Sequence, residues 1–136
     1  MRKKLFTFLF AVMVCTGTMF ALSGSCGVKL TWNLTDSVLT ISGTGQMYTY
    51  YEEYGRRAPW HSYSSEIARV IINDGATSIG NCAFQECSTM TSIEIPNSVT
   101  SIGKLAFNKC FALTSIDIPL GVKYIGTEAF YYCSSL

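Results

Sequence analysis

The chain of 136 residues offers few side chains for catalysis. It contains one histidine, His61, which any Ser-His-Asp or Cys-His arrangement would have to use as its base. His61 follows Trp60 in a segment without a Gly-x-Ser-x-Gly or comparable nucleophile motif. The run 43–45 (Gly-Thr-Gly) leads into a tyrosine-rich stretch, whereas a phosphate-binding loop leads into a helix. The sequence therefore predicts a protein that is not an enzyme and has no cofactor site.

Three cysteines follow a regular spacing. Cys87, Cys110 and Cys133 are equally spaced along the chain and have apolar neighbours. This pattern predicts a column of buried, reduced side chains; the alternative is a disulfide between neighbouring repeats, since an exported protein meets oxidising conditions. Ligands so far apart, in separate repeats, lack the paired short spacing of structural zinc sites, so no metal site is predicted.

Two further cysteines have a different setting. The position of Cys82 is taken one and two periods later by Leu105 and Glu128, so we expect Cys82 to face water. Cys26 lies far upstream, and a Cys26–Cys82 disulfide forms only if the N-terminal segment folds over the first repeat. Both the paired and the free state stay open at this point.

Aromatic residues are dense between positions 48 and 63. They are Tyr48, Tyr50, Tyr51, Tyr54, Trp60 and Tyr63. Flat amphipathic rings suit a sugar- or peptide-binding surface, so these residues form a candidate aromatic binding loop. The alternative is that Trp60 and one or two tyrosines pack the N-terminal segment onto the first repeat, while the others lie in a loop.

These residues must be positioned by a repeated unit, because one motif recurs at a fixed period. Ile-Gly-x-x-Ala-Phe occurs at 79–84, 102–107 and 125–130, so that each copy begins twenty-three positions after the one before. No unit of this length buries its apolar face alone, whereas stacked units do, which predicts a solenoid. We expect Phe84, Phe107 and Phe130 to form one buried ladder in it.

Within a unit, the pattern predicts three pieces. Residues 113–118 carry apolar residues at the first, fourth and sixth positions, as in a strand with one buried face, and Pro119 ends that strand. Residues 122–125 form a second extended piece. Gly126 provides a turn that a side chain would hinder, and residues 127–130 form a single helical turn.

The outward positions of the predicted strands line up in columns. They form a possible ligand-contact face of Arg69, Ile71, Thr91, Ser92, Glu94, Thr114, Ser115 and Asp117. Glu94 and Asp117 would give it a weakly acidic stripe for a protein or a glycan. Ca²⁺ also prefers oxygen ligands, but two carboxylates are too few to predict a calcium site. The alternative is an ordinary solvated face of a half-buried sheet.

The repeat Ile-Gly-x-x-Ala-Phe-x-x-Cys-x-x-Leu-x-x-Ile-x-Ile-Pro resembles that of the BspA-like leucine-rich-repeat family of bacterial surface proteins. The resemblance covers residues 70–136, about three units with the last one truncated, and Met90 stands where Leu is usual. It implies a β-rich leucine-rich-repeat solenoid with short helical turns. It also implies a secreted or cell-surface location and adhesion through binding of an extracellular protein or glycan, without catalytic residues. The alternative is a structural spacer that presents another domain.

The region 24–69 resembles the leader module of such proteins, with Cys26-Gly27, Leu30-Thr31-Trp32, the run 39–45 and Pro59-Trp60. Residues 30–34 and 38–41 alternate apolar and polar side chains, which predicts a β-hairpin. We expect this N-terminal β-hairpin cap module to cover the open edge of the first coil.

The N-terminus predicts export. Residues 1–23 combine Arg2, Lys3 and Lys4 with an apolar run and small residues near Ser23, as in a signal peptide cleaved after Ser23. The alternative is that this segment is a membrane anchor. We expect membrane contact only through this segment or through an unseen anchor. Cleavage leaves seven Lys and Arg against nine Asp and Glu, which argues against nucleic-acid binding. Because Leu136 falls in the middle of a unit, we also expect a longer array.

Overall fold

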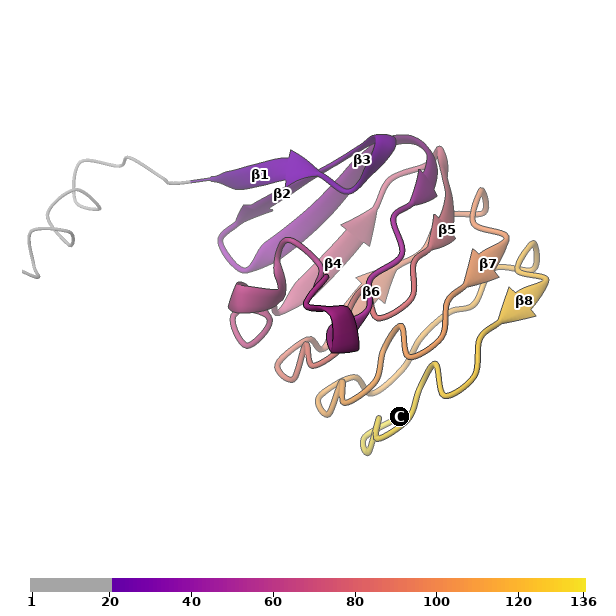
Figure 1. Cartoon of the computed structure of the whole chain (residues 1–136). Helices are drawn as coiled ribbons and strands as arrows, with labels where there is room; N and C mark the ends of the chain where they lie inside the picture. The colour runs from indigo at the N-terminus through magenta and orange to yellow at the C-terminus, as the bar shows by residue number, and fades with distance from the viewer. Residues whose placement is uncertain (1–20) are drawn as a thin grey trace, which may run out of the picture.

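The computed structural model describes residues 21–136, which fold into eight strands and two 3-10 helices (Figure 1). In chain order these are β1 (Leu22–Ser25), β2 (Gly27–Thr35), β3 (Val38–Met47), η1 (Glu52–Tyr54), η2 (His61–Tyr63), β4 (Arg69–Ile72), β5 (Ala76–Ile79), β6 (Ser92–Glu94), β7 (Ser101–Ile102) and β8 (Tyr124–Ile125). Most of the predicted signal peptide lies outside the described residues. The predicted cleavage after Ser23 falls within β1.

The N-terminal hairpin is longer than predicted and has a third strand. β2 pairs antiparallel with β3, and β1 pairs antiparallel with β2. Asp36 (φ 51°) and Ser37 (φ 65°) form the two-residue connection between Thr35 and Val38, and positive φ at both positions matches the twist of a tight hairpin. Buried side chains alternate along β2, as the sequence pattern requires.

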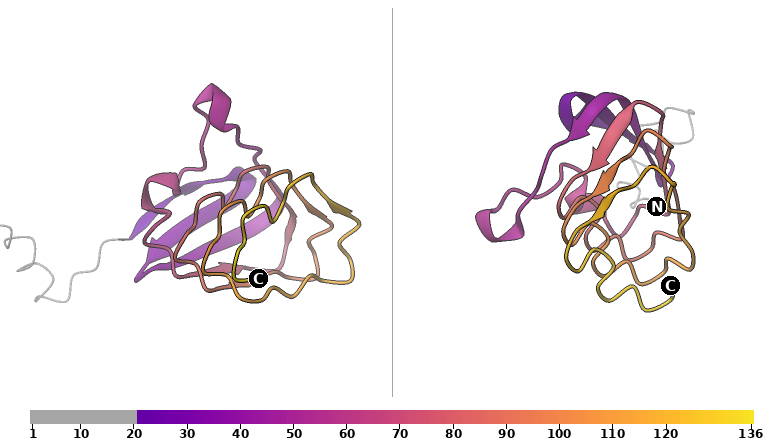
Figure 2. Two further views of the ribbon diagram at one scale, coloured as in Figure 1. Left: turned by 90° about the horizontal axis from the view of Figure 1, so that it is seen from below. Right: turned by 90° about the vertical axis from the view of Figure 1, so that its right-hand side faces the viewer.

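Two parallel ladders run down the solenoid from β3. The first half of β3 pairs with β4, which pairs with β6. The second half of β3 pairs with β5, which is followed by β7 and β8. β3 thus lies at the edge of the first coil in both ladders, and the coils follow one another along a single axis (Figures 1 and 2).

A third side of each coil is a hydrogen-bonded turn. In the first such turn, every second backbone N–H donates to the next coil: Cys82 to Lys104, Phe84 to Ala106, and Glu86 to Asn108. The next turn repeats the pattern from Leu105 to Thr127, from Phe107 to Ala129 and from Lys109 to Tyr131. Alternate residues therefore satisfy their backbone between coils instead of within a helix.

The predicted helical turn at 127–130 is consequently not a helix. It consists of i→i+3 hydrogen-bonded turns, with the N–H of Ala129 bonded to Gly126 O and the N–H of Tyr131 bonded to Glu128 O. Glu128 between them is left-handed (φ 56°), and so are its equivalents Cys82 and Leu105. A left-handed residue at this place prevents the turns from joining into a helix.

An aromatic stack occupies the centre of the solenoid. The predicted ladder is confirmed, with ring centroids 5.6 Å apart for Phe84 and Phe107 and 5.3 Å apart for Phe107 and Phe130. Trp60 extends it at the N-terminal end, 5.7 Å from Phe84, and donates its indole N–H to Ala83 O at 2.8 Å. Trp60 therefore continues the stack one coil before the first repeated phenylalanine.

The predicted strand at 113–118 is absent. Leu113 is buried, but Ile116 and Ile118 are only half-buried, and no backbone hydrogen bond of this segment to β6 is present among the described residues. A strand needs a partner on at least one side. The apolar pattern is present here, but the ladder is not.

The repeated glycine serves close packing between coils. A Cβ on Gly103 would lie 2.5 Å from Asn81 N, and one on Gly126 would lie 2.4 Å from Lys104 N. Neither glycine has a positive φ. Gly126 begins the hydrogen-bonded turn to Ala129, as predicted. A side chain is excluded there because the backbone of the neighbouring coil leaves no room for it, and not because the turn needs a positive φ.

Candidate functional site

The predicted ligand-contact face begins as expected. Parallel pairing places Arg69 beside Ser92 and Ile71 beside Glu94. Arg69 Nη2 lies 3.3 Å from Glu94 Oε1 in an exposed ion pair, and Thr91 donates its hydroxyl to Ala68 O. The predicted acidic stripe is thus neutralised at its first carboxylate.

The face does not continue into the third coil as a ladder. Thr114, Ser115 and Asp117 lie in the unpaired segment 113–118 and follow no strand. Asp117 is therefore not paired with Glu94 through a strand ladder. The paired part of this face is limited to β4 and β6.

The aromatic stretch divides into two groups. Tyr50 and Trp60 are buried, and Trp60 makes edge contacts with Tyr50 and Trp32 at centroid distances of 6.1 and 5.8 Å. Tyr48, Tyr51 and Tyr54 are exposed, whereas Tyr63 is half-buried. The first group packs the N-terminal module on the solenoid, and the exposed group is free to meet a ligand.

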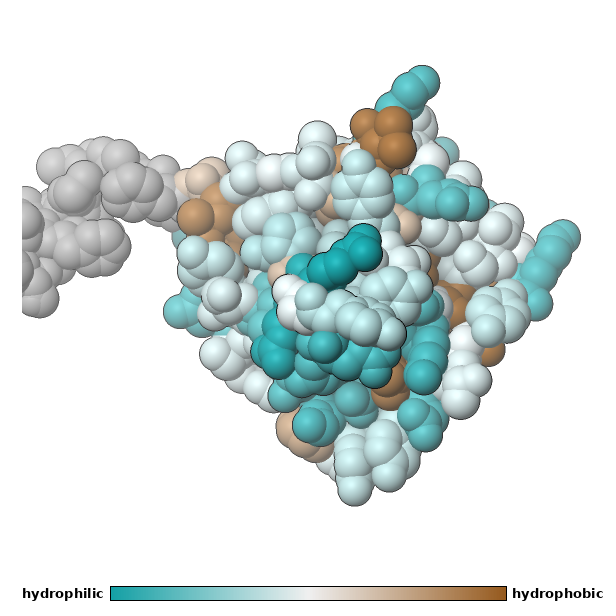
Figure 3. Space-filling view, in the orientation of Figure 1, coloured by the Kyte–Doolittle hydropathy of each residue, from teal (hydrophilic) through white to brown (hydrophobic). Residues whose placement is uncertain are grey.

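A loop carrying two of the exposed tyrosines projects from the side of the solenoid. We call residues 51–57 the η1 loop. The N–H of Tyr51 donates to Arg56 O at 2.9 Å, and Arg56 N–H donates back to Tyr51 O at 3.0 Å, while Gly55 closes η1 in a left-handed conformation (φ 67°). The loop stands clear of the coils in both views of Figure 2. Figure 3 shows hydrophilic side chains gathered over it, with hydrophobic surface close by.

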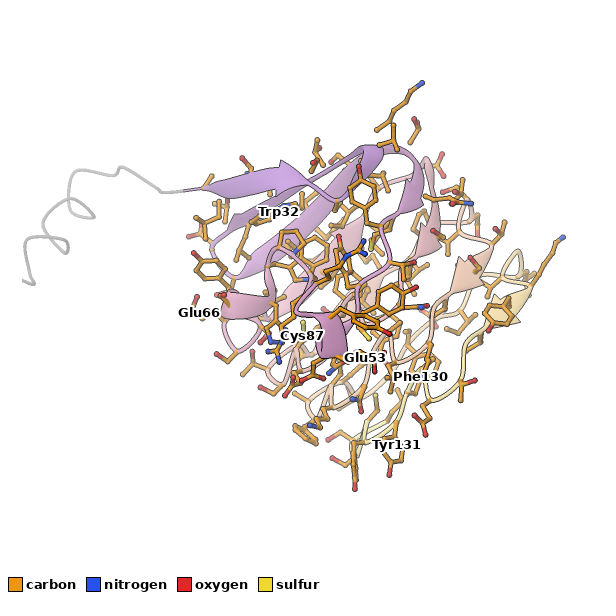
Figure 4. The ribbon with its side chains drawn as sticks, in the orientation of Figure 1. Trp32, Glu53, Glu66, Cys87, Phe130 and Tyr131 are labelled. Carbon is orange, nitrogen blue, oxygen red and sulfur yellow. The ribbon has the colours of Figure 1, made fainter. Side chains whose placement is uncertain are left out.

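A cleft of about 400 Å³ lies between this loop and the turns. Tyr51, Glu52 and Glu53 line one side, and Figure 4 shows Glu53 on this loop, in front of the coils. The cleft falls within the range of volumes usual for small-ligand sites. We call it the η1 cleft.

The opposite side of the η1 cleft comes from two successive turns. Asn81, Cys82 and Gln85 belong to the first turn, and Lys104 and Leu105 repeat the positions of Asn81 and Cys82 one period later. Stacking of coils is therefore what brings these side chains together. The cleft combines amide, carboxylate and ammonium groups with apolar surface.

Glu52 links the projecting loop to the first turn through its side chain. Its Oε1 accepts a 2.7 Å hydrogen bond from Gln85 Nε2, and its Oε2 accepts one of 2.9 Å from Arg57 Nη2. Arg57 Nη1 also lies 2.7 Å from His61 Nε2. An exposed ion pair contributes at most about 1 kcal/mol, and the three contacts together link the loop to the first turn and to η2.

Gln85 is the buried polar residue of the cleft. Its side chain is 7% exposed, and its Oε1 has no hydrogen-bond partner among the described residues. Because a carboxylate only accepts, the bond to Glu52 requires that the Gln85 nitrogen points to Glu52. The unpaired atom is therefore the carbonyl oxygen.

Cys82 lines the cleft and is half-buried, whereas water exposure was predicted. Burial raises the pKa of its thiol above the ordinary value, and a hydrogen bond from the Glu52 backbone opposes this. The thiol is thus mainly protonated near neutral pH and acts as apolar lining. Cys26 and Cys82 are both free, so the disulfide considered from the sequence is absent.

The repeated cysteines form a column of free thiols. Cys87 and Cys110 are fully buried and Cys133 is half-buried; Figure 4 places Cys87 within the fold. Cys110 Sγ donates to Phe84 O at 3.2 Å, and Cys133 Sγ donates to Phe107 O at 3.1 Å. Burial raises the pKa of Cys87 to about 12. The column has a structural role, and the disulfide between repeats is not formed.

Sequence reasoning missed Asn81, Gln85 and Lys104 as cleft residues. Gln85 and Asn108 are both buried amides one period apart, a signal that a search for repeated polar residues would have found. The η1 loop is not part of the repeat. The repeat pattern therefore cannot show that the loop covers Gln85 and not Asn108.

Residues 21–136 lack two other kinds of feature. No group of three or more His, Cys, Asp and Glu side chains in this part of the chain is arranged to hold a metal ion. None of the helices in the same range has the length and apolar character needed to cross a membrane.

Comparisons with known proteins agree with this architecture. The family model described as a BspA type leucine-rich repeat region (6 copies) matches residues 61–136. The match begins at η2, earlier in the chain than the predicted first unit at Val70. No curated protein matches the chain.

Solved structures of bacterial proteins match as well. A leucine-rich repeat protein from Eubacterium ventriosum is 35% identical over 82% of this chain and 30% of its own, with a TM-score of 0.75. A leucine rich cell surface protein from Faecalibacterium prausnitzii is 37% identical over 55% of this chain and 20% of its own, with a TM-score of 0.51. A leucine-rich repeat protein of T. pallidum, 24% identical over 83% of this chain and 58% of its own, shares the fold (TM-score 0.55).

The chain spans less than a third of the length of the first two of these structures. The family match covers more than half of this chain and includes the whole stack of turns from η2 onward. With its period, its parallel ladders and its phenylalanine stack, the chain belongs to the family of proteins with BspA-type leucine-rich repeats.

Proposed function

We propose that this protein works at the outside of a bacterial cell, where it binds an extracellular protein or glycan without catalysing a reaction on it. Its location is inferred from the N-terminal sequence and from the relative described as a cell surface protein. Adhesion to a host or a neighbouring cell is the role that such binding would serve.

The observation that carries the proposal is the η1 loop. It exposes Tyr51 and Tyr54, whose rings lie 5.9 Å apart edge to face, and it forms one side of a cleft of about 400 Å³. No residue of the loop is buried, so the loop does not contribute to the core. Exposed aromatic residues beside a cleft are typical of binding sites, whereas a spacer needs no such loop.

An attachment assay tests this function. Beads coated with the purified protein are incubated with epithelial cells and with other bacteria, and bound beads are counted. We expect the wild type to attach and the Tyr51→Ala/Tyr54→Ala variant to lose most attachment, with unchanged circular dichroism. The matched control, Glu94→Ala/Asp117→Ala, alters the ligand-contact face predicted from the sequence and should attach like the wild type.

The remaining outcomes are equally informative. If only the Glu94→Ala/Asp117→Ala variant loses attachment, the protein binds through the face predicted from the sequence and the η1 loop is not the site. If coated beads never attach to any cell type, the binding function is refuted and the spacer alternative is favoured.

A further inference from the structure

The η1 cleft has the size and the chemistry for one kind of ligand. Resting on the proposed function, we propose that it binds a single hexose unit of an uncharged glycan. The cleft volume of about 400 Å³ lies near the lower end of small-ligand sites, so it admits a ring-sized group and excludes a folded domain.

One hydrogen-bond acceptor among the residues that line the cleft lacks a donor in the part of the chain that the structure describes. Gln85 Oε1 is buried without a partner among the described residues, and its amide nitrogen is already bonded to Glu52. An unpaired buried acceptor is costly. Gln85 Oε1 is enclosed, so a ligand hydroxyl pairs with it only after the Gln85 side chain shifts toward the cleft that it lines. Glu53 forms no ion pair in the described part of the chain and offers a second acceptor.

The charges that line the cleft cancel. Arg57 neutralises Glu52, while the Glu53 carboxylate and the Lys104 ammonium lie on opposite sides of the cleft. A lysine or arginine side chain from a partner would meet Lys104, and a phosphate or carboxylate would meet Glu53. A neutral ligand whose hydroxyls both donate and accept hydrogen bonds suits both.

The apolar surface favours a sugar ring over a more polar ligand. Tyr51 is 37% exposed at the edge of the cleft, and Leu105 and the protonated thiol of Cys82 add apolar area. The C–H groups on one face of a hexose pack against such surface, while its hydroxyls reach the polar groups.

Saturation-transfer NMR on the full chain tests the assignment. The probes are methyl glycosides of glucose, galactose, mannose and N-acetylglucosamine, with lysine amide and methyl phosphate as charged comparisons. We expect signal from at least one glycoside and none from the charged probes. Tyr51→Ala should weaken binding about tenfold, and Tyr124→Ala, which alters an exposed tyrosine of β8 outside the cleft, should change it by less than about twofold.

Gln85→Ala provides a second test with a matched control. Asn108 is the equivalent residue one coil further on, is equally buried, and also has an unpaired carbonyl oxygen among the described residues, but it does not line the cleft. We expect Gln85→Ala to lose glycoside binding and Asn108→Ala to retain it, at similar cost in stability.

The outcomes distinguish a failed sugar assignment from a failed binding function. Coated beads that attach to cells, together with no transfer to any glycoside, would overturn the sugar assignment and leave the binding function intact. Transfer to lysine amide alone would assign the cleft to basic peptide segments and would equally overturn it. Equal loss of binding in Gln85→Ala and Asn108→Ala would show that the cleft is not where the glycoside binds.

Discussion

At the residue scale, the buried ring of Phe107 matters most, because it contacts a ring on each side. It stacks with Phe84 and Phe130 and is fully buried. The sequence predicted this contact because identical residues at a fixed period must occupy equivalent places in a stack. It did not predict that Trp60 extends the stack. The position one period before Phe84 is occupied by His61, and Trp60 lies one residue before it.

Truncation of Phe107 should therefore be severe. We expect Phe107→Ala to lower the free energy of unfolding by about 3–5 kcal/mol, because it removes buried area and leaves a cavity between two rings. Urea denaturation followed by circular dichroism measures it. Phe111→Ala is the control, because Phe111 is 44% exposed and should change stability by less than about 0.5 kcal/mol. Similar losses in both variants would contradict the stack.

At the element scale, the sequence predicted which segments are extended but not which of them pair with a neighbouring coil. The extended piece at 122–125 was predicted and contains β8. The strand at 113–118 was predicted and is absent, because a strand is a property of two paired segments and the apolar pattern describes only one. The η1 cleft was not predicted, because it joins a non-repeated loop to turns that come much later in the chain.

The spacing between coils gives a prediction at the same scale. Gly103→Ala would place a Cβ 2.5 Å from Asn81 N, so neighbouring coils must move apart. We expect a loss of about 1–3 kcal/mol in the free energy of unfolding, as for other overpacked sites. Gly121→Ala is the control, since its Cβ would meet nothing closer than 3.2 Å. A Gly103→Ala variant as stable as the wild type would show that the glycine is not required for close packing.

At the scale of the whole molecule, stability should depend on the protonation of the buried thiols. Burial raises the pKa of Cys87 from 9.0 to about 12, so the folded state favours the neutral thiol. This contribution is complete below about pH 9 and is lost as the pH rises toward 12.

We therefore expect the free energy of unfolding to fall between about pH 9 and about pH 11, with Cys87 contributing a slope of about 1.4 kcal/mol per pH unit. Urea denaturation at several pH values measures the slope, and Cys87→Ala should make it shallower by this amount. An unchanged slope in Cys87→Ala would mean that this thiol titrates normally in the folded protein.

The whole fold depends on coils that stack in register around one line of rings, and the stack also assembles the η1 cleft from two successive turns. Aromatic NOESY on protein with labelled phenylalanine tests this most directly. Centroid distances of 5.6 and 5.3 Å predict cross-peaks between Phe84 and Phe107 and between Phe107 and Phe130, and none between Phe84 and Phe130. Well-resolved spectra without the two predicted cross-peaks would contradict the stacked solenoid.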